Sequence, residues 1–410
     1  MKNMFATLAL KPAVAVLAVS ANLIACGGGS STDNSTDNNS DIPSQLETNS
    51  RVAANFIDNL AIPAYTDFAN KAGDLSGTLQ TYCNTLSQEN NTETTTALNS
   101  AQSAWLALKN DWQASRVYEV GPLADNGGNL ARRIYTANNF DSSTQIFIAN
   151  EVAKRKADNS YIITPNITFK ARGLDALEYL LYSSEQDLTK QKDNCLYAVA
   201  VAQDVKVGAD DIVNMWADEA TRKDLLEPAT SNAVDLISPF FDNVVTVADK
   251  IVKDAGLGEP LALKSDGTCS QDACPELVEN RLSQTTYDSL KANIAGINAL
   301  FTGNGGEGFA IYFEQNGLSD EATNFAQMLS DTSAALTQNR SLLTQVSNIN
   351  TAQRGAACQT VSTTGDTTDT DLAACAAYYH VKQLSDDVKT GAFKLAINLD
   401  LPAAAAGDGD

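Results

Sequence analysis

The sequence predicts an all-α protein built from two up-and-down helical bundles in tandem. Over most of the chain, apolar residues recur three or four positions apart, which is the spacing of one face of a helix. The alternation of apolar and polar residues that marks a half-buried strand is scarce. Residues 257–274 are rich in Gly, Pro, Ser and Asp and separate two helical stretches, so we assign them to a linker between the bundles.

The first residues have the features of an export signal rather than of a folded domain. Lys2 and Lys11 supply positive charge, and the apolar run at residues 12–24 is shorter than the roughly 20 residues that span a bilayer. We therefore assign residues 1–25 to a lipoprotein signal peptide. Leu-Ile-Ala precedes Cys26, so this cysteine is expected to be lipidated and to begin the mature protein. The alternative is an ordinary secretory signal in which the cysteine is incidental.

A tether follows the lipidated cysteine. Residues 26–50 are poor in apolar side chains and rich in Ser, Thr, Asp and Asn, so we predict that they are disordered. The residue after the cysteine is Gly27 rather than Asp, which favours sorting to the outer membrane of a bacterium. The expected location is thus the cell envelope, with the protein held to the membrane by its N-terminal lipid and facing the periplasm or the cell surface.

The first bundle is assigned to residues 51–256. Pro63 and Pro239 are each expected to kink a helix. Residues 123–169 show little helical pattern and are expected to be mostly irregular. The predicted helices cover residues 51–86, 94–120, 171–182, 195–220 and 231–255.

The second bundle is assigned to residues 275–410. A turn is expected at residues 303–308, where glycines cluster, and a Thr- and Asp-rich loop at residues 359–370. The predicted helices cover residues 275–303, 318–349 and 371–399.

The chain is strongly acidic. It carries 50 acidic and 28 basic residues, a formal net charge of -22. Such a surface repels nucleic acid, so no nucleic-acid partner is expected. Arg132 and Arg133 stand out against this background; the pair could bind an anion, but we favour pairing with acids of the protein's own surface.

Six cysteines remain besides Cys26, and an even number in an exported protein indicates disulfides. Short separations suggest two of the pairs, and elimination gives the third. The expected bonds are Cys269–Cys274, Cys358–Cys375 and Cys83–Cys195. The last of these closes a long loop and would contribute about 4–5 kcal/mol to stability in the chain-entropy account.

The most informative stretch is residues 171–182, which read A-R-G-L-D-A-L-E-Y-L-L-Y. Its leucines form one apolar face of a helix, while Asp175, Glu178 and Tyr182 recur on a second face. Two carboxylates three positions apart suit a hard cation inside a helical bundle. The alternative is an ordinary helix N-terminus in which Arg172 pairs with Asp175.

This stretch resembles the signature of the imelysin family, also called peptidase family M75, which carries Gly-x-His-x-x-Glu followed by Tyr-Leu-Leu. Gly173 and Glu178 match, and Asp175 stands at the histidine position. Residues 105–122, with the pattern W-(x)6-W-x-x-x-R…E-x-G-P, and residues 276–303 resemble two further blocks of the family. The resemblance covers most of the chain after the tether.

The resemblance implies a pair of helical bundles and a connection to iron uptake. In the family, the acid near the Gly-Pro pair is thought to lie close to the signature, so Glu119 is the candidate third carboxylate. Gly173, Arg116 and Tyr182 are the supporting residues. Because Asp175 replaces an imidazole with an oxygen ligand, the expected ligand is a divalent or ferric cation such as iron, calcium or manganese.

Three functions stay open at this point. The leading one is a lipid-anchored, metal- or iron-related binding protein with a carboxylate cleft, whose expected partners are iron-uptake or other envelope proteins. The second is a metal-dependent peptidase of the M75 type, and the third is a non-catalytic interaction scaffold at the cell surface. His380 is the only histidine, and neither G-x-S-x-G nor H-E-x-x-H occurs, so the residues themselves give the peptidase little support.

Overall fold

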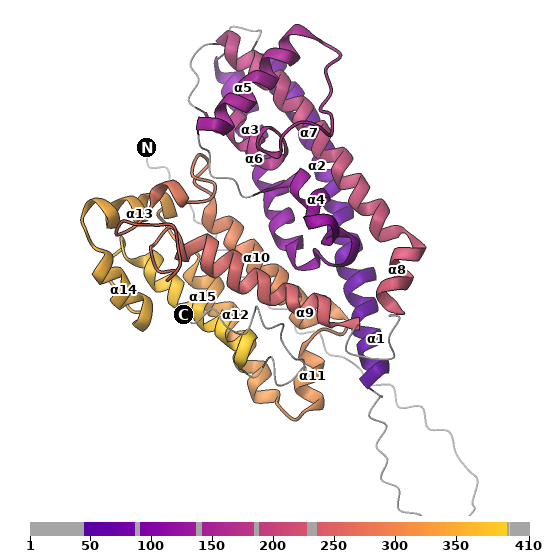
Figure 1. Cartoon of the computed structure of the whole chain (residues 1–410), viewed down its shortest axis with the longest axis vertical. Helices are drawn as coiled ribbons and strands as arrows, with labels where there is room; N and C mark the ends of the chain where they lie inside the picture. Colours follow the sequence, from indigo (N-terminus) through magenta and orange to yellow (C-terminus); the bar gives the residue numbers. More distant parts are fainter. Residues whose placement is uncertain are drawn as a thin grey trace, which may run out of the picture. The chain divides into compact units, whose positions relative to one another are not determined.

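Most of the described chain is helical, as a computed structural model shows. The described residues are 45–86, 91–136, 142–183, 188–227, 236–391 and 393. These ranges contain no strand, which confirms the predicted all-α class (Figure 1). The signal peptide, Cys26 and residues 26–44 of the tether lie outside the described residues. No helix in the described ranges is long and apolar enough to cross a membrane.

The first helical run begins at Gln45, so the last residues assigned to the tether are helical rather than disordered. It consists of α1 (Gln45–Asn55), the π-helical segment η1 (Phe56–Ala61) and α2 (Ile62–Thr85). Pro63 lies in the first turn of α2, where its missing N–H costs little. The proline therefore coincides with the change from π to α geometry, consistent with the interruption expected there.

Three long helices of the first half lie side by side: α2, α3 (Asn91–Ser115) and α7 (Leu188–Ala217) (Figure 1). The signature stretch forms α6 (Gly173–Tyr182), which packs against α3 and α7. The predicted Cys83–Cys195 bond is confirmed and joins α2 to α7. The other two predicted disulfides, Cys269–Cys274 and Cys358–Cys375, are confirmed as well.

The expectation that residues 123–169 are mostly irregular was wrong, because two helices lie there. They are α4 (Asp125–Ile134) and α5 (Ser142–Ala157), flanked by the 3-10 turns η3 (Gly121–Leu123) and η4 (Phe169–Ala171). Few of their apolar residues are buried. Ile148 of α5 is buried, but Ile146 and Phe147 on the same helix are exposed, which leaves no clear apolar stripe in the sequence.

The chain then passes through α8 (Glu219–Leu226) and α9 (Ser238–Val245), and α9 continues as the π-helical segment η6 (Thr246–Gly258). Pro239 lies in the first turn of α9 and begins that helix, so the predicted kink is wrong. The segment up to Cys274 is irregular, as expected for the linker, and is followed by the turn η7 (Pro275–Leu277). The division of the chain into two bundles at this linker stays a prediction.

The second half contains more and shorter helices than predicted. The single helix expected over residues 318–349 is wrong, because Ser341 begins a new helix there by accepting a hydrogen bond from the backbone N–H of Thr344 at 3.3 Å. The loop expected at residues 359–370 is helical up to Thr364. The helices are α10 (Thr286–Thr302), α11 (Ala310–Gln315), α12 (Ser319–Ala335), α13 (Leu342–Thr351), α14 (Gly355–Thr364) and α15 (Ala373–Thr390).

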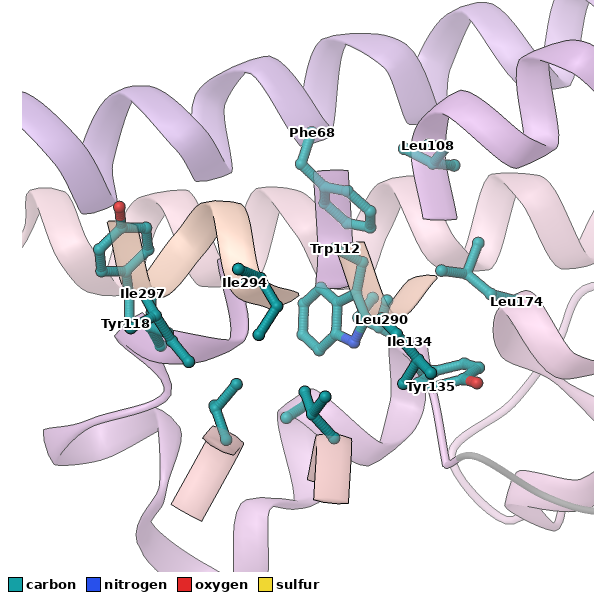
Figure 2. Close-up of a cluster of buried hydrophobic side chains, with 14 of the residues drawn as sticks. Phe68, Leu108, Trp112, Tyr118, Ile134, Tyr135, Leu174, Leu290, Ile294 and Ile297 are labelled. Atoms are coloured by element: carbon teal, nitrogen blue, oxygen red, sulfur yellow. The ribbon is translucent and has the colours of Figure 1, made fainter. Parts of the chain in front are cut away.

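Helix α10 packs closely against α3, and this contact positions the candidate site. Trp112 of α3 lies at the centre of the buried cluster, with Leu290 and Ile294 of α10 beside it (Figure 2). The backbones touch at Gly296, where an added Cβ would lie 2.2 Å from the carbonyl oxygen of Ala114. Only glycine permits this approach.

The Gly296→Ala variant should therefore lose about 1–3 kcal/mol of unfolding free energy, because a backbone carbonyl cannot move aside for the new methyl group. Gly77→Ala is the matched control, since Gly77 is helical, exposed and has no atom within 4 Å of an added Cβ. This control should gain about 0.5–1 kcal/mol from helix propensity. Urea denaturation measures both, and equal effects of the two substitutions would contradict the close contact.

Candidate functional site

The first turn of α6 is held against the end of α4 by a glycine. Gly173 has a φ of 74°, and an added Cβ would lie 2.5 Å from the carbonyl oxygen of Ile134 and 2.9 Å from that of Arg133. A side chain is excluded both by the left-handed backbone and by the lack of space. This close approach fixes where the following acids point.

Asp175 points into the protein and is only 2% exposed. The backbone N–H and the hydroxyl of Thr136 both donate to its Oδ2 atom, each at 2.8 Å. Burial raises the pKa of Asp175 to about 7; the bonds from Thr136 oppose the shift, and the neighbouring carboxylates Glu178 and Glu279 add to it. This carboxyl group thus changes charge near neutral pH.

Glu178 is fully buried and joins α6 to the segment that precedes α10. The backbone N–H and hydroxyl of Ser283 donate to its Oε1 atom at 2.9 and 2.8 Å. The amide of Asn280 donates to its Oε2 atom at 3.1 Å. Both carboxylate oxygens are therefore already engaged by donors of the protein.

Lys109 of α3 supplies a positive charge beside these acids and is also fully buried. Its ammonium group donates to Asn280 Oδ1 and Ser289 Oγ and lies 3.8 Å from Glu279 Oε1. Burial lowers the pKa of Lys109, while Glu279, Glu178 and Asp175 oppose the shift. The ammonium group also lies 5.3 Å from the ring centroid of Tyr135.

Glu279 completes what we call the buried ionic cluster, which consists of Lys109, Asp175, Glu178 and Glu279. Its Oε1 atom accepts hydrogen bonds from the hydroxyl of Tyr135 and, at 3.1 Å, from the amide of Gln113. Three carboxyl groups therefore share one ammonium group in the interior. The raised pKa of Asp175 follows from this excess of acid as well as from its burial.

The alternative in which Arg172 pairs with Asp175 is wrong. Arg172 instead contacts Asp204 of α7, with Nε 2.9 Å from Oδ2 and Nη2 2.5 Å from Oδ1. Arg133 binds the same carboxylate from the other side, with Nη2 2.7 Å from Oδ1. Asp204 thus pairs with Arg172 and Arg133 near the start of α6. Asp175 and Glu178 are part of the buried ionic cluster instead.

The predicted third carboxylate, Glu119, lies at a cavity next to the cluster rather than in it. Its Oε1 atom is 3.3 Å from Arg116 Nε. The cavity has a volume of about 460 Å³, and Thr136, the donor to Asp175, forms part of its wall. We call it the Arg116 cavity; it is lined by Trp112, Arg116, Glu119, Gly128, Ala131, Arg132, Tyr135, Thr136, Thr168, Phe169 and Lys170.

Tyr182, the last residue of the predicted polar face, does not bond either acid. Its hydroxyl donates to the carbonyl oxygen of Gln102 at 3.4 Å. Burial raises its pKa to about 12, and the charge of Glu178 adds to the shift. Tyr182 therefore packs beside the site, with its ring 5.3 Å from that of Trp105.

The acids do not form a ready ligand set for a metal ion. In the part of the chain that the structure describes, no three His, Cys, Asp or Glu side chains are grouped to hold one. Both oxygens of Glu178 accept bonds from Ser283 and Asn280, and the ammonium group of Lys109 supplies the neighbouring positive charge. An ion bound here would have to displace these donors. The assignment of the acids as metal ligands stays a prediction.

Lys109 and the Glu279–Asn280 pair were not predicted as site residues. A signal for Lys109 was present, because it follows Trp105 by four positions and so lies on the apolar face of α3. A lysine on such a face is buried only with partners. Asn280 gave no such signal: its φ of 52° and its contact with Glu178, 102 positions away, depend on the fold.

These features define an all-α bundle protein with a buried ionic cluster beside a cavity of small-molecule size. The family profile of imelysin, Peptidase M75, matches residues 61–381, and the chain belongs to that family.

The relatives agree with this assignment. Iron-regulated protein A of Synechococcus elongatus is 23% identical over 277 residues, which are 67% of this chain and 70% of the relative. The crystal structure of an imelysin-like protein from Psychrobacter arcticum matches with a TM-score of 0.66 at 16% identity, over 87% of this chain and 98% of that one. A solved structure from Parabacteroides distasonis matches with a TM-score of 0.57 at 16% identity, over 84% and 95% of the two chains.

The raised pKa of Asp175 makes stability depend on pH. An unfolded carboxyl group titrates near pH 3.9, so between about pH 4 and 7 the unfolded chain has lost a proton that the folded chain keeps, and stability falls as the pH rises. The Asp175→Asn variant lacks this effect. Its unfolding free energy relative to the unsubstituted protein should therefore rise across this window, by up to about 4 kcal/mol.

Urea denaturation at several pH values between 4 and 7 measures this difference. The control is Asp74→Asn, because Asp74 is exposed on α2; its difference should stay flat within about 0.5 kcal/mol. A pH-independent difference for Asp175→Asn would show that this carboxyl group is ionised in the folded protein throughout the window.

Proposed function

We propose that the protein is a non-catalytic binding protein of the bacterial cell envelope, tethered by a lipid on Cys26, whose iron-related ligand occupies the Arg116 cavity. One observation carries this proposal. Thr136 forms part of the cavity wall and also donates two hydrogen bonds to Asp175 of the buried ionic cluster. A ligand that contacts Thr136 is thereby coupled to a carboxyl group that titrates near neutral pH.

The iron relation is supported by the name of a relative, Iron-regulated protein A of Synechococcus elongatus. The envelope location is supported by the cleavage pattern before Cys26 and by three disulfides, which form in oxidising compartments. The expected partners in this role are proteins of iron uptake or other envelope proteins.

His380 and the signature acids favour a binding function over peptidase activity. His380 lies half-buried on α15, and its backbone carbonyl accepts a hydrogen bond from Thr332. Both oxygens of Glu178 and the Oδ2 atom of Asp175 accept hydrogen bonds from Ser283, Asn280 and Thr136, which does not favour activation of a water molecule by these acids. A lipid-anchored scaffold without a ligand is the remaining alternative, and it gives no role to the cavity.

The proposed lipid on Cys26 can be tested by removing the thiol that would carry it. A chain with Cys26→Ser has no thiol for lipidation, so it should move from the membrane fraction to the soluble envelope fraction of cells that carry it. Immunoblots of fractionated cells measure this. The control is Ser30→Ala, a substitution in the same segment that leaves the cysteine in place; membrane association that persists in Cys26→Ser would refute the lipid anchor.

The iron relation is tested in a strain that lacks the protein. This strain should grow more slowly when iron is chelated, and the full chain should restore growth. The Ala131→Phe variant should not restore it, because Ala131 is buried in the cavity wall and the larger ring fills the space. Ala157→Phe, an equal change at an exposed position at the end of α5, should restore growth fully.

Melting temperatures of both variants establish that they fold. Growth that does not depend on iron, or full restoration by a folded Ala131→Phe variant, would exclude the proposed role.

A further inference from the structure

We propose that the Arg116 cavity binds a small oxyanion, a carboxylate or phosphate compound, through the guanidinium groups of Arg116 and Arg132. The inference deepens the proposed function, since it rests on the same cavity being the ligand site and names the chemical class of the ligand. The acids of the signature stretch suggested a cationic ligand, whereas the ligand proposed here is an anion.

Arg116 has donors that the protein does not use. Its side chain is 18% exposed, and its Nε atom is buried without a hydrogen bond. Glu119 forms an ion pair with that atom at 3.3 Å, in a geometry outside that of a normal hydrogen bond. Beyond this ion pair, no described residue accepts a hydrogen bond from the Arg116 side chain, although a guanidinium carries five N–H donors in a planar fork. Such a fork fits the two oxygens of a carboxylate or phosphate group.

Arg132 is the second donor, and it differs from its neighbour Arg133 in having no carboxylate partner among the described residues. Arg133 is bound by Asp204 and Asp211 of α7. The guanidinium of Arg132 lies 4.7 Å from the ring centroid of Phe169. Stacking on this ring orients the planar group at the cavity wall and leaves its edge N–H groups for an acceptor.

The remaining lining residues suit an anion. Lys170, whose ammonium donates to Ser143 at 2.9 Å, adds a third cation to the wall. Glu119 is the acid among the described lining residues; burial raises the pKa of Glu119, although Arg116 opposes the shift. Arg116 and Arg132 thus bring two guanidinium groups to this cavity in a protein whose net charge is -22. The volume of about 460 Å³ is within the usual range for small-molecule sites.

The experiment uses the mature protein with inorganic phosphate, citrate and ferric citrate as probes. Calorimetry measures binding, and tryptophan fluorescence reports it at the cavity because Trp112 lines the wall. At least one probe should bind. Arg116→Gln and Arg132→Gln should each weaken it by about tenfold or more, the effect of losing a charge-assisted hydrogen bond. Arg155→Gln, on α5 outside the cavity lining, should leave the affinity unchanged.

The Glu119→Gln variant distinguishes an anionic ligand from a cationic one. An anion should bind this variant more tightly, because the variant removes the negative charge of Glu119; a cation held by Glu119 would bind it more weakly. Arg132 is exposed, so Arg132→Gln remains a folded test even if Arg116→Gln proves unstable. The inference is overturned if none of the three anions binds, or if Glu119→Gln weakens the binding.

The two proposals fail separately. If citrate and ferric citrate bind equally and iron-limited growth is normal, the iron relation fails and the anion site stands. If growth depends on iron but no anion binds, the anion site is overturned and the iron relation stands.

Discussion

Lys109 holds an ammonium group in the interior, and the rest of the site depends on how that charge is compensated. A buried cation is tolerated only when carboxylates and hydrogen-bond acceptors surround it. Its partners come from distant parts of the sequence: Asn280 is 171 positions away and Ser289 is 180. The charge on α3 therefore requires that α10 and the segment before it dock on α3 together. Removing one of these acceptors would leave the buried ammonium group less well compensated.

Much of the fold could be predicted from the sequence, because helix periodicity is a local signal. The long helix that carries Trp105 and Trp112 shows it clearly, and disulfide pairing followed from spacing and count. Prediction from apolar periodicity failed where a helix buries few apolar side chains. Helix α5 exposes Ile146 and Phe147, so its sequence has no apolar stripe. Short interruptions such as the one before Ser341 failed for another reason, since a capping serine is hard to distinguish from a surface serine.

The candidate site was predictable in part. The pairing of Asp175 with Glu178 on one inward face follows from helix geometry, and the structure brings both into the interior. Their partners could not be deduced, because the hydrogen bonds to Glu178 cross 102 and 105 positions. Nor could the sequence separate Arg132 from Arg133, although only the second faces the acids of α7. Tertiary packing decides which of two arginines adjacent in sequence pairs with a carboxylate.

The bond between Cys83 and Cys195 joins two of the longest helices across 112 positions. In a reducing cytosol its thiols stay separate, so α2 and α7 would be held by packing alone. A chain in the proposed envelope location crosses a membrane through a translocation channel before it folds, and a cross-link that closes only on the far side cannot obstruct that passage. Protein made in a reducing compartment would then be a less constrained species than the exported one. The oxidation state of this pair thus records which side of the membrane a given molecule has reached.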